Sequence, residues 1–211
     1  MNGARHDGPF GLLKLGILCG VLAPLLWASA IVFCGTLRPG FNHFTQYISE
    51  LGERGSSTEL LMRYLAFVPT GLMHVAFAGA LAATFKSSRL AVLAAILLGL
   101  NGLARIGAGF FPCEIGCEQT GSLGQRMHSL SASVGFLAIA ASTILWGIVF
   151  KRTSNLRKLA AYSVTSGVLG LVFLLLMWSG EHGTARGLFE RLSSGVLSLW
   201  ILVFALRLRQ R

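Results

Sequence analysis

The chain has 211 residues, of which 54% are hydrophobic and only 12% are charged, and its formal net charge is +10 at pH 7. Its mean hydropathy of +0.67 lies outside the range of ordinary water-soluble domains. The composition therefore excludes a soluble globular fold and indicates a membrane protein.

Six apolar runs follow one another along the chain, each long enough to cross a hydrocarbon core of roughly 30 Å as a helix. The predicted spans are residues 12–34, 61–85, 90–110, 127–150, 159–179 and 188–206. The sequence has none of the alternating ten-residue segments that a membrane barrel needs. We therefore predict an all-α polytopic bundle of six transmembrane helices, forming one domain over residues 1–211.

The first predicted span admits a second interpretation. Lys14, an apolar stretch and the segment Ala28-Ser29-Ala30 resemble a signal peptide with its cleavage site. The apolar run continues through residues 31–33, which favours a retained helix. Pro24 removes one backbone hydrogen bond in mid-span and is expected to bend this helix.

The charged residues sort onto two sides of the membrane. All four lysines fall on the side of the chain termini, whereas seven of the eight acidic residues fall in the opposite loops. Lys and Arg in short loops mark the cytoplasmic side, so we predict that both termini are cytoplasmic, in the cell inner (plasma) membrane. The basic excess is explained by this orientation and by attraction to anionic lipid. Membrane lipids, and not nucleic acid, are the expected partners; the sequence identifies no partner protein.

Two cysteines, Cys113 and Cys117, lie in the loop after the third span, on the predicted external side. An oxidising exterior favours a disulfide between them, and Gly116 helps so small a ring to close. A redox-active pair and metal ligation stay open as alternatives, because a C-x-x-x-C spacing alone is weak.

Ionisable residues at membrane depth need a different explanation, because a charge there normally faces the bundle interior or a water-filled cavity. Arg105 lies near the outer end of the third span and His74 near the middle of the second. A neutral, hydrogen-bonded His74 and an Arg105 that snorkels outward are the plainer interpretations. Four of the five histidines map to the external half, which favours a polar cavity there, roofed by residues 43–54 and 113–126.

The predicted site draws on these external residues. Histidine and glutamate serve both proton transfer and metal binding, and arginine holds phosphate or carboxylate. No H-x-x-x-H spacing occurs, so any metal site must be assembled from different helices. The acid–base candidates are His43, Glu50, His128 and His182; the head-group or anion-binding candidates are Arg105 and Arg191; the candidate ligands of a divalent metal such as zinc are His43, His74, Glu114 and His128.

Four short segments together resemble a known family. They are residues 47–52 (YISELG), residues 107–117 (GAGFFPCEIGC), His128 and residues 187–191 (GLFER). In combination they resemble the bacterial and archaeal membrane family called domain of unknown function 998, over essentially the whole chain. The resemblance implies a six-helix integral membrane protein and supplies no activity, substrate or cofactor.

Two classes of function follow from these observations. The first is an enzyme that hydrolyses or transfers a group on a lipid or lipid-linked substrate at an extracytoplasmic His/Glu/Arg site. The second is a non-catalytic lipid-binding, sensor or accessory membrane protein. A small transporter and a thiol-redox protein are further alternatives, although the largely apolar inner halves of the spans disfavour transport.

Overall fold

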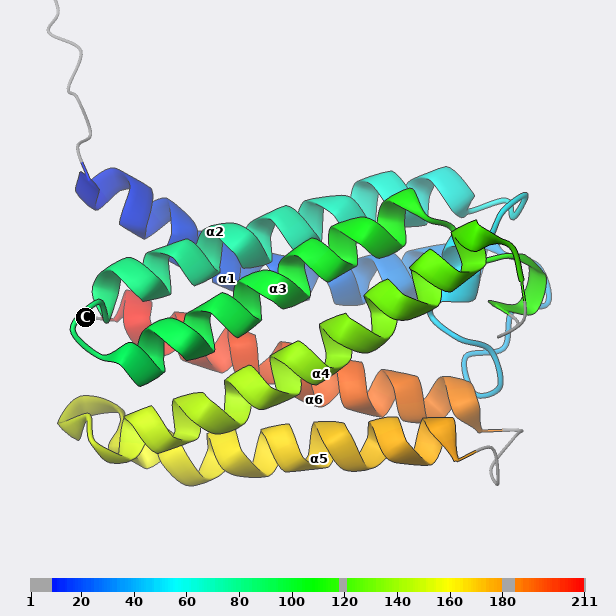
Figure 1. Ribbon diagram of the computed structural model, residues 1–211. Helices are drawn as coiled ribbons and strands as arrows, with labels where there is room; N and C mark the ends of the chain where they lie inside the picture. Colours follow the sequence, from blue (N-terminus) through cyan, green and yellow to red (C-terminus); the bar gives the residue numbers. More distant parts are fainter. Residues whose placement is uncertain (1–8, 118–120, 180–184, 211) are drawn as a thin grey trace, which may run out of the picture.

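The computed structural model describes residues 9–117, 121–179 and 185–210. Its main elements are six long helices that run side by side (Figure 1). They are α1 (Pro9–Leu37), α2 (Val68–Thr84), α3 (Arg89–Phe110), α4 (Leu123–Lys151), α5 (Ala160–Trp178) and α6 (Arg186–Arg209). No strand occurs in these described ranges. All six helical segments are long and apolar enough to cross a membrane, which confirms the predicted all-α, six-span fold.

Shorter helical pieces extend two of the spans. A π-helical stretch, Leu61–Phe67, leads directly into α2, and a 3₁₀ turn, Ser154–Leu159, leads into α5. Two further 3₁₀ turns, Ser49–Gly52 and Ile115–Cys117, lie in the connecting loops. The fourth span was predicted to begin at residue 127, but Ser122 caps α4 by accepting a hydrogen bond from the Gln125 backbone nitrogen at 3.4 Å. This cap starts the helix at Leu123, so His128 lies more than a turn inside it.

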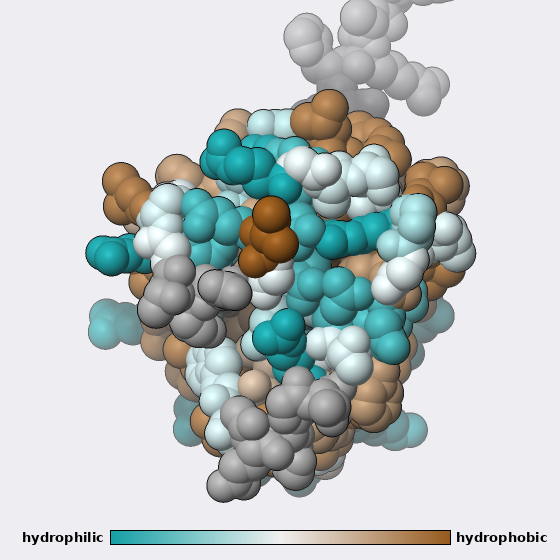
Figure 2. All heavy atoms as spheres, turned by 90° about the vertical axis from the view of Figure 1, so that its right-hand side faces the viewer, coloured by the Kyte–Doolittle hydropathy of each residue, from teal (hydrophilic) through white to brown (hydrophobic). Residues whose placement is uncertain are grey.

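Each helix packs against its neighbours in the chain, and α6 returns to pack against α1. The bundle is therefore a closed ring of antiparallel neighbours. The segments 38–60 and 111–117 lie together at one end, which we call the loop end; it is on the right in Figure 1. Hydrophilic side chains gather on that end (Figure 2). Pro24 and the segment 28–30 lie within the unbroken helix α1.

The interior changes character along the bundle. In the half away from the loop end, aromatic rings fill the space between helices, with the ring centroids of Trp146 and Phe204 4.9 Å apart and those of Phe150 and Phe204 4.8 Å apart. In the other half, buried histidine, glutamate and asparagine and the half-buried Arg105 enter the interior. Large apolar side chains such as Leu12, Leu72, Leu103 and Leu199 are exposed on the outside, as contact with lipid tails requires. Among the described residues, the buried histidine, arginine and glutamate side chains thus lie toward the loop end, whereas hydroxyl groups such as those of Ser142 and Ser163 are buried farther from it.

Candidate functional site

The first loop is fastened to the beginning of α6. The Ile48 backbone nitrogen donates to Glu190 Oε2 at 2.5 Å, and Arg191 Nη1 donates to the Gln46 carbonyl oxygen at 2.7 Å. The Leu188 backbone nitrogen donates to the Phe44 carbonyl oxygen at 2.9 Å. This approach requires glycine at position 187, because a Cβ there would overlap the backbone of Gln46.

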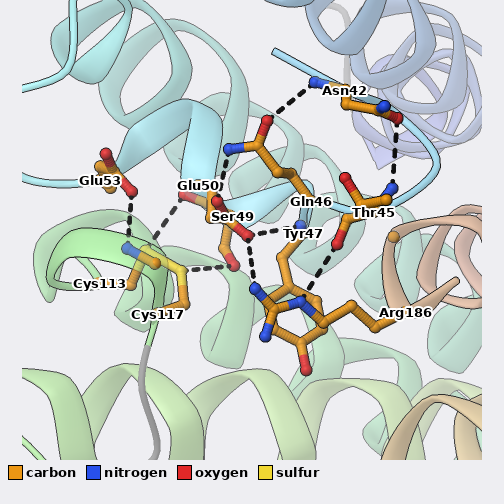
Figure 3. A network of polar contacts seen from close by, with 12 residues as sticks. Asn42, Thr45, Gln46, Tyr47, Ser49, Glu50, Glu53, Cys113, Cys117 and Arg186 are labelled. Atoms are coloured by element: carbon orange, nitrogen blue, oxygen red, sulfur yellow. Dashed lines mark hydrogen bonds and ion pairs between the residues drawn. A yellow bond between two sulfur atoms is a disulfide. The ribbon is translucent and has the colours of Figure 1, made fainter. Parts of the chain in front are cut away.

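Glu50 is the centre of a hydrogen-bond network within the first loop (Figure 3). Its carboxylate, in a residue only 2% exposed, accepts from Gln46 Nε2 and from the Tyr47 backbone nitrogen, each at 2.8 Å. Arg186 Nη2 lies 3.8 Å from the same carboxylate. The predicted acid–base residue Glu50 is therefore engaged in holding the loop in shape.

Arg186 also contacts the ring of Tyr47, whose centroid lies 4.7 Å from its guanidinium carbon. Burial raises the pKa of Tyr47, and the positive charge of Arg186 partly offsets that rise. Tyr47 is therefore a neutral hydrogen-bonding group, and it lines a cavity described below.

The cysteine loop packs against the same first loop. Cys113 and Cys117 form a disulfide, which confirms the predicted pairing. The Arg54 backbone nitrogen donates to the Cys113 carbonyl oxygen at 3.0 Å, and the Gly116 backbone nitrogen donates to Glu53 Oε2, also at 3.0 Å. Gly116 has φ = 72°, a left-handed conformation that glycine adopts without steric cost. The two loops therefore form one cover over the end of the bundle.

Ser49 joins the cover to the disulfide. Its hydroxyl lies 3.3 Å from Cys117 Sγ, and its carbonyl oxygen lies 3.4 Å from Cys113 Sγ. Ser49 also lines both cavities beneath the cover. Three segments that are far apart in the sequence thus meet around Ser49: residues 47–52, 107–117 and 187–191.

An inner cavity of about 50 Å³ lies below the cover, between α3, α4 and α6. Arg105 from α3, His128 from α4 and Glu190 from α6 line it, together with Ser49, Asn101 and Ser194. A site of this size holds only a few water-sized groups. The cavity thus brings together a cation, an imidazole and a carboxylate from three different helices.

Arg105 enters the inner cavity and does not snorkel to the surface. Its guanidinium carbon lies 3.9 Å from the ring centroid of Trp27, and Trp27 Nε1 donates to Ser194 Oγ at 2.9 Å. The Nη1 atom of Arg105 is buried and has no hydrogen-bond partner among the described residues. A buried cation with an unused donor is a costly feature that binding of an anion would relieve.

His128 has a defined tautomer. Its Nδ1 donates to the Phe111 carbonyl oxygen at 2.7 Å and lies 3.2 Å from the Ala108 carbonyl oxygen. Because carbonyl oxygens only accept hydrogen bonds, the ring proton is on Nδ1 and Nε2 carries the lone pair. His128 lines both cavities, so this lone pair is the basic group available to the site.

An outer cavity of about 460 Å³ adjoins the inner one. Residues of α4 and α5 form most of its wall, including Phe136, Leu174 and Met177, and Tyr47, Gln125 and Cys117 line its polar part. It shares Ser49, His128 and Glu190 with the inner cavity. The two cavities share these residues, so together they form one chamber.

Several predicted site residues lie outside this chamber. His74 Nδ1 is 2.8 Å from Asn101 Oδ1, and Asn101 Nδ2 donates to the Gly135 carbonyl oxygen at 3.0 Å, so His74 is satisfied by helix packing. Glu114 Oε2 accepts from the Ser122 backbone nitrogen at 3.4 Å, and hydrogen bonding by the side chain and then the backbone of Ser122 lowers the pKa of Glu114. His182 lies outside the described residues.

His43 and Arg191 form a separate pair at the side of the first loop. Arg191 Nε donates to His43 Nδ1 at 3.1 Å, and burial followed by the charge of Arg191 lowers the pKa of His43. Arg191 lines an apolar hollow between α1 and α6 and not the inner cavity. Of the acid–base and anion-binding candidates, Arg105 and His128 line the inner cavity.

The structure also identifies a group that could bind a metal. Ligand atoms of Cys113, Cys117 and His128 all lie within 4.8 Å of one another. Of the predicted metal ligands only His128 belongs to this group, since His43, His74 and Glu114 are held elsewhere.

Several residues that line the chamber were not among the predicted site residues, including Trp27, Asn101, Gln125 and Glu190. Asn101 gave a usable signal, because an amide in the middle of an apolar span must find a partner within the bundle. Trp27 and Gln125 gave none, because a tryptophan within an apolar span and a glutamine in the first turn of a helix are both ordinary.

The fold and the chamber define a class: a six-helix integral membrane protein with a polar, partly buried chamber near one end of the bundle. The family model described as "Protein of unknown function (DUF998)" matches residues 21–207, and the chain belongs to that family. No curated protein and no solved structure matches the chain.

Proposed function

We propose that the protein binds the anionic head group of a lipid or lipid-linked molecule in its chamber and acts on that head group by acid–base chemistry. The observation that carries the proposal is the buried, unpaired Nη1 of Arg105 in the inner cavity. The planar guanidinium fork matches the oxygen geometry of a carboxylate or phosphate. With room for only a few water-sized groups, the inner cavity admits the charged tip of a head group, and the outer cavity takes the remainder.

The membrane orientation forms part of the proposal. The end opposite the loop end carries basic residues with no acidic residue of the described chain among them; they include Lys86, Arg89, Lys151, Arg152, Arg157, Lys158, Arg207 and Arg209. The positive-inside rule then puts both termini in the cytoplasm and the chamber in the outer half of the plasma membrane. The substrate would be a lipid or lipid-linked molecule of that leaflet.

The residues of the chamber support hydrolysis or group transfer. His128 Nε2 accepts a proton from water or from a hydroxyl nucleophile, and its Nδ1–H is held by backbone carbonyl groups in the orientation that this requires. Arg105 stabilises negative charge that develops on the head group. Glu190, which lines both cavities, is the nearby carboxyl group for returning a proton to the leaving group.

One observation favours a second candidate, a non-catalytic lipid-binding or sensor protein. Glu190 Oε2 accepts a hydrogen bond from the Ile48 backbone nitrogen and so holds the first loop on α6. Because Glu190 lines the chamber and also holds the first loop, a ligand bound in the chamber can change the position of the loop without any chemical reaction. This candidate shares the head-group site at Arg105.

The test compares the lipids that co-purify with the wild type, with Arg105→Leu and with Arg54→Leu. Arg54 is exposed in the first loop, so its replacement removes the same charge outside the chamber. We expect the anionic lipid to be lost only in Arg105→Leu, and an unchanged lipid profile in that variant would refute the head-group site. His128→Ala then separates the two candidates. If the protein is an enzyme, this variant still binds the lipid but no longer converts it. If the protein only binds lipid, the wild type does not convert the lipid either.

A further inference from the structure

The disulfide lies beside the imidazole of His128, a residue that lines the chamber. Ligand atoms of Cys113, Cys117 and His128 come within 4.8 Å of one another, and all three side chains are buried. We propose that, once the disulfide is reduced, these three residues bind one zinc ion. This site does not depend on head-group binding at Arg105, but zinc would occupy the same His128 Nε2 lone pair that serves as the base in the proposed function, so the two roles of His128 exclude each other.

The surroundings of His128 are those of a metal ligand. A ligating histidine normally donates its other ring N–H to a carboxylate or backbone carbonyl, which fixes the ring and its tautomer. His128 Nδ1 makes that contact with the Phe111 carbonyl oxygen at 2.7 Å, leaving Nε2 free to ligate. Ser49 supplies a comparable contact for sulfur, because its hydroxyl lies 3.3 Å from Cys117 Sγ and can donate to a thiolate there.

The ligand set selects the metal and leaves one position open. Two thiolates and one imidazole suit zinc, whereas magnesium and calcium prefer oxygen ligands. Three protein ligands are one fewer than a tetrahedral zinc ion requires, so the fourth position is taken by water or substrate. Cys117 and His128 both line the outer cavity of about 460 Å³, and that position therefore opens into the chamber.

The disulfide and the zinc site exclude each other, because the same sulfur atoms form both. A small-molecule dithiol supplies two electrons and two protons to the Cys113–Cys117 bond and becomes a disulfide itself, leaving two protein thiols. Zinc then binds Cys113 Sγ, Cys117 Sγ and His128 Nε2 and releases the two thiol protons to solvent. Zinc occupancy thus reports the thiol–disulfide balance at the loop end.

The backbone leaves room for the sulfur atoms to separate. A Cβ added at Gly116 would meet nothing within 4 Å, so the side of this segment that faces away from Glu53 has open space into which it can move. Two Zn–S bonds of about 2.3 Å at a tetrahedral angle need sulfur atoms roughly 3.8 Å apart. Only the turn Ile115–Cys117 has to change its conformation to bring the two sulfur atoms to this separation.

The test uses the full-length protein, purified in detergent without a histidine tag, in a reduced and a non-reduced sample. After removal of the dithiol under anaerobic conditions, each sample receives zinc, and bound metal is measured by elemental mass spectrometry. We expect about one zinc per chain after reduction and almost none without it. Zinc should also protect Cys113 and Cys117, but not Cys19 or Cys34, from alkylation, as read residue by residue in digests.

Variants assign the ligands. His128→Ala should weaken zinc binding by more than about 10-fold, the smallest usual effect of losing even an outer-shell partner, whereas His43→Ala should leave it unchanged. Cobalt in place of zinc should give thiolate-to-metal charge-transfer absorption in the reduced wild type. The proposal is overturned if the reduced wild type binds no metal, if zinc does not protect Cys113 and Cys117, or if binding survives in His128→Ala. The wild-type alkylation result decides the matter even where a variant fails to fold.

Discussion

Replacing Gly187 by alanine should detach the first loop from α6. A Cβ at this position would lie 2.8 Å from both the backbone nitrogen and the carbonyl carbon of Gln46. Carbon atoms make favourable contacts only at about 3.5–4.0 Å, so one backbone segment has to move. The movement also disturbs the hydrogen bonds that Leu188 and Arg191 make with the loop.

The size of the effect follows from the packing. Overpacking of this kind costs about 1–3 kcal/mol in the free energy of unfolding. For a chain of this length 1 kcal/mol corresponds to about 2–4 °C, so the melting temperature of Gly187→Ala should fall by about 2–12 °C. Differential scanning fluorimetry in detergent measures this change, and Gly195→Ala is the matched control. A Cβ at Gly195, on the same helix, would meet nothing within 4 Å, and alanine there favours the helix by about 1 kcal/mol.

The two alanine variants should therefore shift the melting temperature in opposite directions. Gly187→Ala should also increase proteolytic cleavage within residues 38–60, because the loop loses its attachment. A Gly187→Ala protein as stable as Gly195→Ala, with an equally protected loop, would refute the close packing of the first loop on α6.

Two further predictions concern pH and orientation. His43 has a lowered pKa and accepts a hydrogen bond from Arg191, so its neutral form stabilises the fold above the unfolded pKa of about 6.5, and this contribution is lost as the pH falls below that value. The difference in melting temperature between the wild type and His43→Phe should thus shrink from pH 8 to pH 5, and a constant difference would contradict the contact. An impermeant maleimide applied to intact cells should label Ser57→Cys but not Asn155→Cys; the reverse pattern would mean that the chamber faces the cytoplasm.

The fold could be predicted from the sequence because its determinants are local. A run of about 20 apolar residues becomes a membrane helix wherever it occurs, and six such runs define six spans. The Cys113–Cys117 pair was predictable for the same reason, since only four positions separate the two cysteines. Only the helix ends differed, as at Leu123, where the cap of Ser122 starts α4 earlier.

The site could be predicted only in part, because it depends on how each helix is rotated about its own axis. Arg105 and His128 point into the same inner cavity, whereas His74 on α2 meets Asn101 and leaves the site. Glu50 and His43 were predicted as acid–base residues because of their chemistry and their side of the membrane. Their partners, Arg186 and Arg191, lie in the first turns of α6, about 140 residues later in the sequence. No local sequence pattern predicts a contact over that separation.

The central claim is that an anionic amphiphile occupies the chamber, and photo-crosslinking tests it most directly. Vesicles containing an anionic phospholipid with a diazirine on its acyl chain near the head group would be irradiated with the wild type and with Arg105→Leu, and the adducts mapped by mass spectrometry. We predict adducts concentrated on Phe136, Leu174 and Met177, which line the outer cavity, and their loss in Arg105→Leu. Adducts spread evenly over the exposed faces of all helices, or gathered in the hollow between α1 and α6 and unchanged in the variant, would contradict the account.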